Sequence, residues 1–272
     1  MKTHSMYCYA LSALALAIAP FVRGQGLPES QPKLLTIIRE SVKPGQGADH
    51  AKHEAGWPAA YEKAKSPDFY LAMTSMTGPT EAWYLVPQQS HAAAAETMKR
   101  EDKDPVLSAE LARLALRDAQ FIDSVRVVQT VARPDLSLGD FPDLAKVRFY
   151  EVNIFSVRPG QTQKFEALSK LYAKVRKRAA PDSSYRTYAV IAGMSSPTYF
   201  SFTTVEDYAK FDQTGADHAK AMASSTPEEK AEFDKFGDYV MRQETQRFRL
   251  DPGQSYVPAA TRAKDSEFWS PK

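Results

Sequence analysis

The sequence predicts an α+β fold in which two tandem βαββαβ repeats close a barrel within one chain. The first observation is that the segment 41–46 (SVKPGQ) returns as 156–161 (SVRPGQ) at an offset of 115 residues. The second is that each copy ends an apolar run and precedes the same order of helix and strand signals. An offset of this length indicates a duplicated domain, because the units of solenoid repeats run to about 50 residues.

The first 24 residues are typical of a secretory signal peptide and are set aside from the fold. Their apolar run, from Tyr9 to Ala19, has about 11 residues and is too short to span a bilayer, which needs about 20. We expect cleavage before Gln25, with an uncleaved N-terminal anchor as the alternative. No twin arginine is present, so we predict Sec-type export to the periplasm or medium, with no membrane span after cleavage.

Charge and cysteine content exclude several classes of protein. The chain has 35 basic and 33 acidic residues, and loss of Lys2 and Arg23 with the signal leaves 33 of each. Nucleic-acid binders usually carry a basic patch, and the only dense basic run, 174–178, is expected to be a solvated helix face. We therefore predict no nucleic-acid partner. The single cysteine, Cys8, lies in the signal, so the mature chain has no disulfide or thiol chemistry.

The first repeat is expected over 34–134, after a polar lead-in at 25–33. Apolar and β-branched runs predict strands, and Ser-Pro-Asp at 66–68 ends the first helix. The expected elements are a strand at 34–42, a helix at 48–65, hairpin strands at 70–75 and 81–86, a helix at 107–122 and a strand at 125–133. A loop-like linker with Gly, Pro and acidic residues follows at 135–147.

The second repeat is expected over 148–252 and has clearer signals. Its first helix presents one apolar face, because Phe165, Leu168 and Val175 recur at helical spacing. The expected elements are a strand at 149–157, a helix at 163–178, hairpin strands at 185–193 and 198–203, a helical region at 205–236 interrupted at Gly215 and 224–227, and a strand at 239–250. Residues 253–272 are expected to be a tail, or alternatively an arm docked by Tyr256, Phe268 and Trp269.

The order βαββαβ is that of a ferredoxin-like unit. Such a unit covers one face of its sheet with helices and leaves the other face bare, and a bare apolar face must be buried. Two fused units can bury their bare faces against each other, which gives a pseudo-dimeric barrel in one chain. Further homo-oligomerisation is left open.

The run 149–160 (FYEVNIFSVRPG), followed by a helix, a hairpin and a helix, resembles the dimeric α+β barrel superfamily. That superfamily includes NIPSNAP-like proteins, antibiotic-biosynthesis-type monooxygenases and haem-degrading monooxygenases. The resemblance covers both repeats, and its motif is a strand ending in Val-Lys/Arg-Pro-Gly before a helix. It implies the fold and little about function, because the superfamily holds both enzymes and inert binders.

Strand alternation puts Phe149, Glu151, Asn153 and Phe155 on one face, and we expect this face to line the barrel interior. Asn153 and Glu151 are then candidate catalytic groups, and Phe149 and Phe155 are candidate ligand contacts. The resemblance implies a further aromatic contact on the third strand, for which Tyr199 or Phe200 is the candidate. The resemblance implies a role for Asn153, because haem-degrading members carry an asparagine seven residues before the strand-ending glycine. It also implies a helical histidine, for which His218 is the candidate, although it falls about one turn short of the expected place. The alternatives are a hydrogen-bonded structural Asn and an exposed His.

His50 and His53 form the remaining candidate site. Histidines at i and i+3 share a helix face and could chelate a metal ion, with Asp49 or Glu54 as a further ligand. At the 115-residue offset they align with Phe165 and Leu168, which are expected to face the core. Two histidines fall short of the three protein ligands typical of catalytic zinc, and the first turns of this helix could be open to water.

The sequence leaves three hypotheses for the function. No phosphate-cradling glycine loop, GxSxG elbow or HExxH pair is present in the sequence. The first hypothesis is an exported NIPSNAP-like protein that binds a small apolar or aromatic molecule in the barrel without catalysis. The second is a monooxygenase or isomerase of the same superfamily that needs little or no cofactor. The third is a haem- or metal-binding protein. We expect no cofactor, with haem or a metal ion as the alternative.

Overall fold

The computed structural model describes residues 27–270, so the predicted signal segment lies outside the described residues. The elements of the first part of the chain are β1 (Leu34–Val42), α1 (Gly47–Glu54), α2 (Gly56–Ala64), β2 (Tyr70–Ser75), β3 (Glu81–Gln88), α3 (His91–Lys103), α4 (Pro105–Asp118) and β4 (Ile122–Ala132). Those of the second part are the short 3₁₀ helix η1 (Pro134–Leu136), β5 (Phe149–Val157), α5 (Thr162–Ala179), β6 (Arg186–Ala192), β7 (Thr198–Val205), α6 (Lys210–Ala223), α7 (Pro227–Phe233), α8 (Phe236–Tyr239), β8 (Val240–Tyr256), α9 (Ala259–Lys264) and α10 (Ser266–Trp269).

Local chemistry explains where these elements begin and turn. The Pro-Gly pairs after β1 and β5 use the left-handed conformation that glycine adopts freely, with φ of +80° at both Gly45 and Gly160. The Ser90 side chain caps α3, and Asp104 caps α4 just before Pro105 at its first position. Thr226 and Glu229 form a reciprocal capping box at the start of α7.

The eight strands form one closed barrel in the order β1-β3-β2-β8-β5-β7-β6-β4. All neighbouring strands are antiparallel. Strands β1–β4 make one half and β5–β8 the other, and the halves join where β2 pairs with β8 and β4 pairs with β6. The predicted α+β class and closed barrel are therefore confirmed.

An apolar core fills the barrel interior, with side chains from both halves. Trp83 of β3 belongs to this core, with its ring centroid 4.6 Å from that of Phe248 and 6.0 Å from that of Phe200. All three side chains are fully buried. An eight-stranded barrel is just wide enough for side chains to fill it, and this interior is packed in that way.

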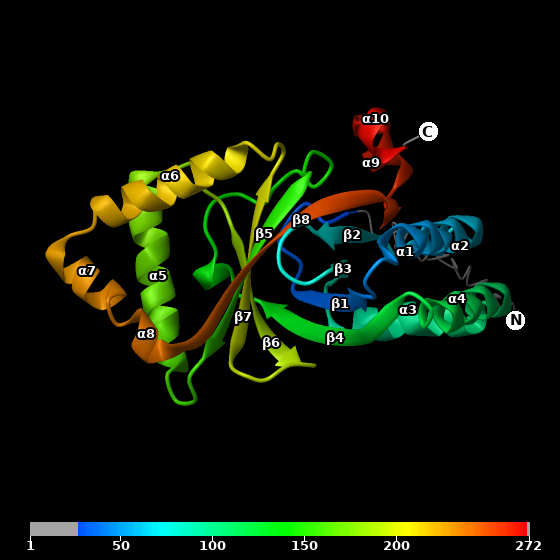
Figure 1. The fold of residues 1–272 in the computed structure, drawn as a ribbon, viewed down its shortest axis with the longest axis horizontal. Helices are drawn as coiled ribbons and strands as arrows, with labels where there is room; N and C mark the ends of the chain where they lie inside the picture. The colour runs from blue at the N-terminus through cyan, green and yellow to red at the C-terminus, as the bar shows by residue number, and fades with distance from the viewer. Residues whose placement is uncertain (1–26, 271–272) are drawn as a thin grey trace, which may run out of the picture.

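The helices cover the outside of the barrel in two groups. Figure 1 shows α1–α4 on one side and α5–α8 on the opposite side, with the strands between them. Between helices and strands lie separate apolar clusters, one around Tyr70 and Tyr84 in the first half and one around Phe165 and Tyr199 in the second. No helix in residues 27–270 is long and apolar enough to cross a membrane.

The structure differs from the expected elements in several places. The helix expected at 107–122 ends at Asp118, and β4 begins at Ile122. The α3 helix was not predicted, because its only buried or half-buried apolar residues are alanines and it lacks an apolar stripe. The α6 helix continues through Gly215, where a Cβ would meet nothing, so the expected interruption is wrong there. The segment after 252 is no free tail: β8 runs to Tyr256, and the α10 residue Trp269 is buried in the barrel core and donates to Ala145 O at 2.9 Å.

Candidate functional site

A pocket of about 60 Å³ lies at one end of the barrel, and we call it the barrel-end pocket. One water molecule needs about 10–15 Å³, so the pocket has room for a small organic molecule. Interior side chains of both halves form its floor: Leu35, Leu71, Leu85, Tyr150, Tyr188 and Phe202. Residues of the lead-in and the linker cover it: Leu27, Pro28, Pro32, Phe141, Pro142 and Leu144.

Two polar groups of the pocket lining have no hydrogen-bond partner within the described residues. These are the hydroxyl of Tyr150 and Nε of Arg186. Burial raises the pKa of the Tyr150 phenol, which therefore stays a neutral hydroxyl. Burial also lowers the pKa of the Arg186 guanidinium, but arginine remains charged in proteins. The Arg186 Nη2 atom donates to Gly139 O at 2.5 Å, which holds the side chain beside the pocket.

The prediction of which face of β5 lines the barrel interior is wrong. Tyr150, Val152 and Ile154 point into the interior core, and the alternate residues lie on the outer face toward the helices. The physical reason is that a small closed barrel is filled by side chains. The strictly apolar set of the strand therefore goes inside, and the mixed set meets the helices.

The candidate ligand contacts Phe149, Phe155 and Tyr199 lie outside the barrel interior. The Phe155 ring packs against Phe165 of α5 at 5.6 Å, and Tyr199 packs against the same ring at 4.8 Å. Phe149 contacts Tyr208 at 5.4 Å. Phe155 and Tyr199 pack the strands of the second half against α5, and none of the three residues lines the barrel-end pocket.

The candidate catalytic residues of the second half each have a protein partner. Asn153 Oδ1 accepts from Thr245 Oγ1 at 2.7 Å, and Glu151 accepts from Arg247 Nε at 3.0 Å. His218 Nδ1 lies 3.0 Å from the hydroxyl of Tyr172, and burial lowers its pKa. No hydrogen bond in the described part of the chain joins His218 to Asn153 or Glu151. A haem role for this group stays a prediction.

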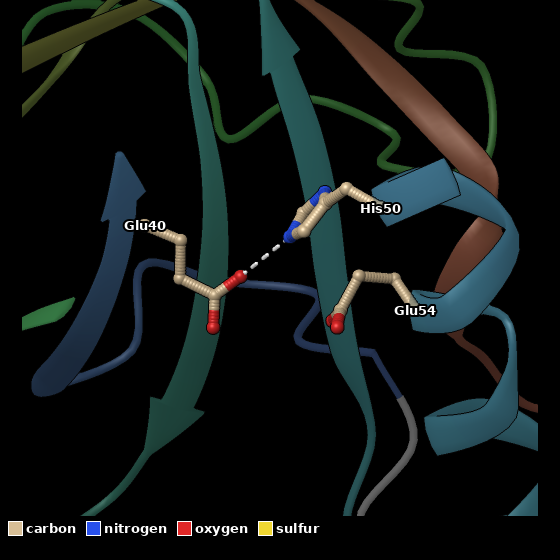
Figure 2. A group of neighbouring side chains, drawn as sticks. All are labelled: Glu40, His50 and Glu54. Carbon is tan, nitrogen blue, oxygen red and sulfur yellow. Dashed lines mark hydrogen bonds and ion pairs between the residues drawn. The ribbon is translucent and has the colours of Figure 1, made fainter. Parts of the chain in front are cut away.

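His50 and His53, in contrast, lie in a group of buried ionisable residues that we call the His–carboxylate cluster: Glu40, His50, His53, Glu54 and Asp118. The expectation that both histidines face the core is confirmed, and the alternative of a face open to water is wrong. His50 and Glu54 are each only 2% exposed. Figure 2 shows Glu40 reaching from β1 toward His50 and Glu54, which extend from α1.

Short contacts connect the members of the cluster. His50 Nε2 lies 3.0 Å from Glu40 Oε2, and His53 Nε2 lies 2.9 Å from Asp118 Oδ1 and 3.1 Å from Leu114 O. The contact with Leu114 O has hydrogen-bond geometry and the contact with Asp118 does not, so Asp118 Oδ1 is buried without a hydrogen-bond partner. Two groups of these side chains lie close enough together to hold a metal ion: Glu40–His50–Glu54 and His53–Glu54–Asp118. Glu54 belongs to both groups and so connects them.

Neighbouring side chains orient the Glu54 carboxyl. The Tyr84 hydroxyl donates to Glu54 Oε2 at 2.6 Å, and Trp57 Nε1 donates to Oε1 at 3.2 Å. Desolvation by burial raises the pKa of Glu54 to about 9, and hydrogen bonding with Asp118 and the charge of Glu40 add to the increase. A carboxyl that strongly disfavours its own charge in this way is characteristic of functional sites.

Sequence reasoning missed Glu40 and Asp118. A usable signal existed for Glu40, because the 115-residue offset aligns it with Phe155, just as it aligns His50 with Phe165. Strand and helix thus both carry an ionisable residue where the second half has an aromatic pair. Asp118 had no such signal, since it lies at the end of α4 and only the fold brings it to His53.

Comparison with known proteins relates the chain to others by fold alone. No family model and no curated protein matches the sequence. The structure is similar to a "putative monooxygenase" from Fusobacterium nucleatum, with a TM-score of 0.53, 10% identity and coverage of 81% of this chain and 93% of that one. It is also similar to an anthrone oxidase-like protein, with a TM-score of 0.51, 11% identity and coverage of 82% and 94%. A chlorite dismutase variant from Candidatus Nitrospira defluvii has a TM-score of 0.51, 10% identity and coverage of 82% and 94%. The chain therefore has the dimeric α+β barrel fold.

Proposed function

We propose that this protein binds a small apolar or aromatic molecule in the barrel-end pocket. The observation that carries the proposal is the combination of an apolar lining with two unpartnered polar groups, the Tyr150 hydroxyl and Arg186 Nε. Ligand pockets are mostly apolar and contain a few polar groups that fix orientation. A hydroxyl and a guanidinium among the lining residues favour a ligand whose ring carries one acceptor, such as a carboxylate or a phenolate.

Binding without catalysis is the better-supported function for this pocket. Its lining contains no Asp, Glu or His within the described residues, so no general base or acid of those types faces it. The monooxygenase or isomerase alternative keeps only the support of a fold shared with the oxidase-like neighbours.

Ligand binding can be tested with 2-naphthoate as the probe and a pocket-filling variant. Thr204 lines the pocket, and Thr203, the preceding residue of β7, does not. We expect Thr204→Phe to lose most of the binding seen by calorimetry, because the new ring occupies the pocket. Thr203→Phe introduces the same ring on the other face of the strand and should bind like the wild type. Equal binding by both variants, or no binding by the wild-type protein of 2-naphthoate and a panel of small aromatic acids and phenols, would refute the proposal.

The proposal includes the origin of the fold and the location of the protein. We infer a NIPSNAP-like chain of two tandem ferredoxin-like repeats, supported by the repeated segment and by the order strand-helix-strand-strand-helix-strand in each half. Residues 25–140 expressed alone should then expose the apolar sheet face and dimerise or aggregate, and a stable soluble monomer would contradict this. Export predicts a mature N-terminus near Gln25, and N-terminal sequencing of the protein from its native host checks it.

A further inference from the structure

We propose that the His–carboxylate cluster binds one divalent transition-metal ion, with Glu40, His50 and Glu54 as its protein ligands. This site lies outside the barrel, between β1 and α1, and is separate from the barrel-end pocket. The three ligand atoms all lie within 4.8 Å of one another. His50 Nε2 and Glu40 Oε2 are 3.0 Å apart, which is close to the spacing of two atoms bound at about 2.0–2.2 Å to one ion.

The charge of the cluster favours a cation. Glu40, Glu54 and Asp118 are all buried, and within the described residues none of them forms an ion pair with a lysine or arginine. Buried charges are normally paired or coordinate a metal. The cluster thus places three carboxyl groups and two imidazoles together with no lysine or arginine paired to them, which is a set of side chains that can coordinate a metal ion.

Two buried polar atoms, one in the cluster and one on the neighbouring strand β2, have no hydrogen-bond partner in the part of the chain that the structure describes. Asp118 Oδ1 belongs to the group that shares Glu54, and its side chain is 8% exposed; it lies 2.9 Å from His53 Nε2, but that contact lacks hydrogen-bond geometry. The hydroxyl of Tyr70, on the strand next to Tyr84, is the second. Unsatisfied buried polar atoms are rare in folded proteins and often indicate an ion or a water molecule.

The surroundings resemble the outer shell of a metal site. Ligating carboxylates are usually held by further hydrogen bonds, and Glu54 accepts from Tyr84 at 2.6 Å and from Trp57 at 3.2 Å. The Tyr84 hydroxyl is also 3.2 Å from Oε1 of Gln254, which is fully buried. One imidazole and two carboxylates suit Zn²⁺, Mn²⁺ or Fe²⁺ better than Ca²⁺ or Mg²⁺, which prefer oxygen alone.

The second half shows that the fold does not need polar groups here. At the 115-residue offset, Glu40 aligns with Phe155 and His50 with Phe165. Those two rings pack directly on each other, with centroids 5.6 Å apart, and they join the strand to its helix without any charge. An aromatic pair would therefore serve the packing of β1 on α1, which makes a purely structural role for Glu40 and His50 unnecessary.

The test uses the chain from residue 25 onward, treated with a chelator and then titrated with Zn²⁺ by calorimetry and with Co²⁺ by visible absorption. His91→Gln, at the exposed start of α3, serves as the background. We expect one equivalent of either metal ion, a higher melting temperature with Zn²⁺, and ligand-field bands with Co²⁺. Uptake of no Zn²⁺, Mn²⁺ or Co²⁺ by the folded protein would overturn the proposal and leave the cluster as a hydrogen-bonded network.

Two variants assign the ligands. Glu40→Gln keeps the shape of the side chain and removes its charge, and it should weaken Zn²⁺ binding at least about tenfold. The matched control is Glu110→Gln on the exposed surface of α4, which should bind as tightly as the background. If Glu40→Gln does not fold, His50→Phe takes its place, because it copies the residue at the aligned position of the second half. Unchanged stoichiometry, affinity and Co²⁺ spectrum in whichever of the two folds would also overturn the proposal.

Discussion

Replacement of Tyr150 by phenylalanine separates the stability of the barrel from its ability to bind a ligand. The Tyr150 ring is buried in the interior core, and its hydroxyl has no hydrogen-bond partner within residues 27–270. A tyrosine-to-phenylalanine change usually removes a hydrogen bond and destabilises the protein. Here it removes only a desolvated hydroxyl, and leaving such a group unsatisfied costs about 1–3 kcal/mol.

We therefore expect Tyr150→Phe to leave the free energy of unfolding unchanged or to increase it by about 1 kcal/mol. For a domain of this size such an increase raises the melting temperature by about 2–4 °C. Scanning calorimetry measures the change. In the same variant, binding of 2-naphthoate should weaken, because the ligand loses a donor that nothing in the protein uses.

Tyr199→Phe provides the matched comparison. Tyr199 is as buried as Tyr150, but its hydroxyl donates to Glu166 Oε1 at 2.6 Å. Hydrogen bonds to charged groups contribute about 1.5–3 kcal/mol, so this variant should be destabilised by about that amount. The reasoning fails if Tyr150→Phe is destabilised by more than about 1 kcal/mol, because the hydroxyl would then have a partner worth that much.

Four further substitutions test a charge pair, the packing of the core and two glycine positions. The Arg133 guanidinium lowers the pKa of Glu166, so Glu166→Gln should cost about 1 kcal/mol at pH 7. Because folding lowers the pKa of Glu166, the difference in stability between wild type and variant should shrink as the pH falls below the ordinary value of 4.5. A difference in melting temperature that does not change with pH would contradict this. Trp269→Ala removes a buried ring from the core and should lower the free energy of unfolding, measured with denaturant, by about 3–5 kcal/mol. If the C-terminal segment were a free tail, the variant would be as stable as the wild type. Gly160→Ala, at φ +80° in open space, should lower the free energy of unfolding by about 1–2 kcal/mol. Gly193→Ala should lower it clearly more, because the new Cβ would lie 2.0 Å from Val127 O. Equal losses in the two variants would show that the backbone at Gly193 moves to relieve the clash.

Most of the fold could be predicted because its signals are local. The strand at 149–157 and the turns at Pro44-Gly45 and Pro159-Gly160 agree with the structure, since β-branched runs and glycine conformation act within a few residues. The α3 helix escaped prediction because it stays on the surface and buries no residue. The aromatic residues of the C-terminal segment indicated the alternative of a docked arm, which the burial of Trp269 confirms. Its partner Ala145 lies 124 residues away, and nothing near position 269 identifies it.

The orientation of β5 shows how a correct pattern can lead to the wrong face. Alternation separated Tyr150, Val152 and Ile154 correctly from Glu151 and Asn153. Which set faces inward depends on the width of the barrel, which is a property of the closed sheet and not of one strand. The assumption of a polar, open interior reversed the assignment.

The candidate metal site was half visible in the sequence for a similar reason. His50 and His53 lie on one helix and could be seen by their spacing, whereas Glu40 and Asp118 come from a strand and a distant helix. Comparison of the two halves at the 115-residue offset would have added Glu40. Nothing local could have added Asp118, because only the packing of α4 on α1 brings its carboxylate to His53.

Closure of the barrel determines where this molecule can place a ligand pocket and where it can place charged groups. Because apolar side chains fill the interior, a ligand can enter only where the packing ends, and the barrel-end pocket lies there, under the lead-in and linker. Charged groups are instead placed on the outer face, between a strand and its covering helix. In the second half an aromatic pair occupies that position, and in the first half Glu40 and His50 do. The two halves therefore share a backbone order but differ in the chemistry of this position, since a carboxylate and an imidazole replace two aromatic residues without opening the barrel.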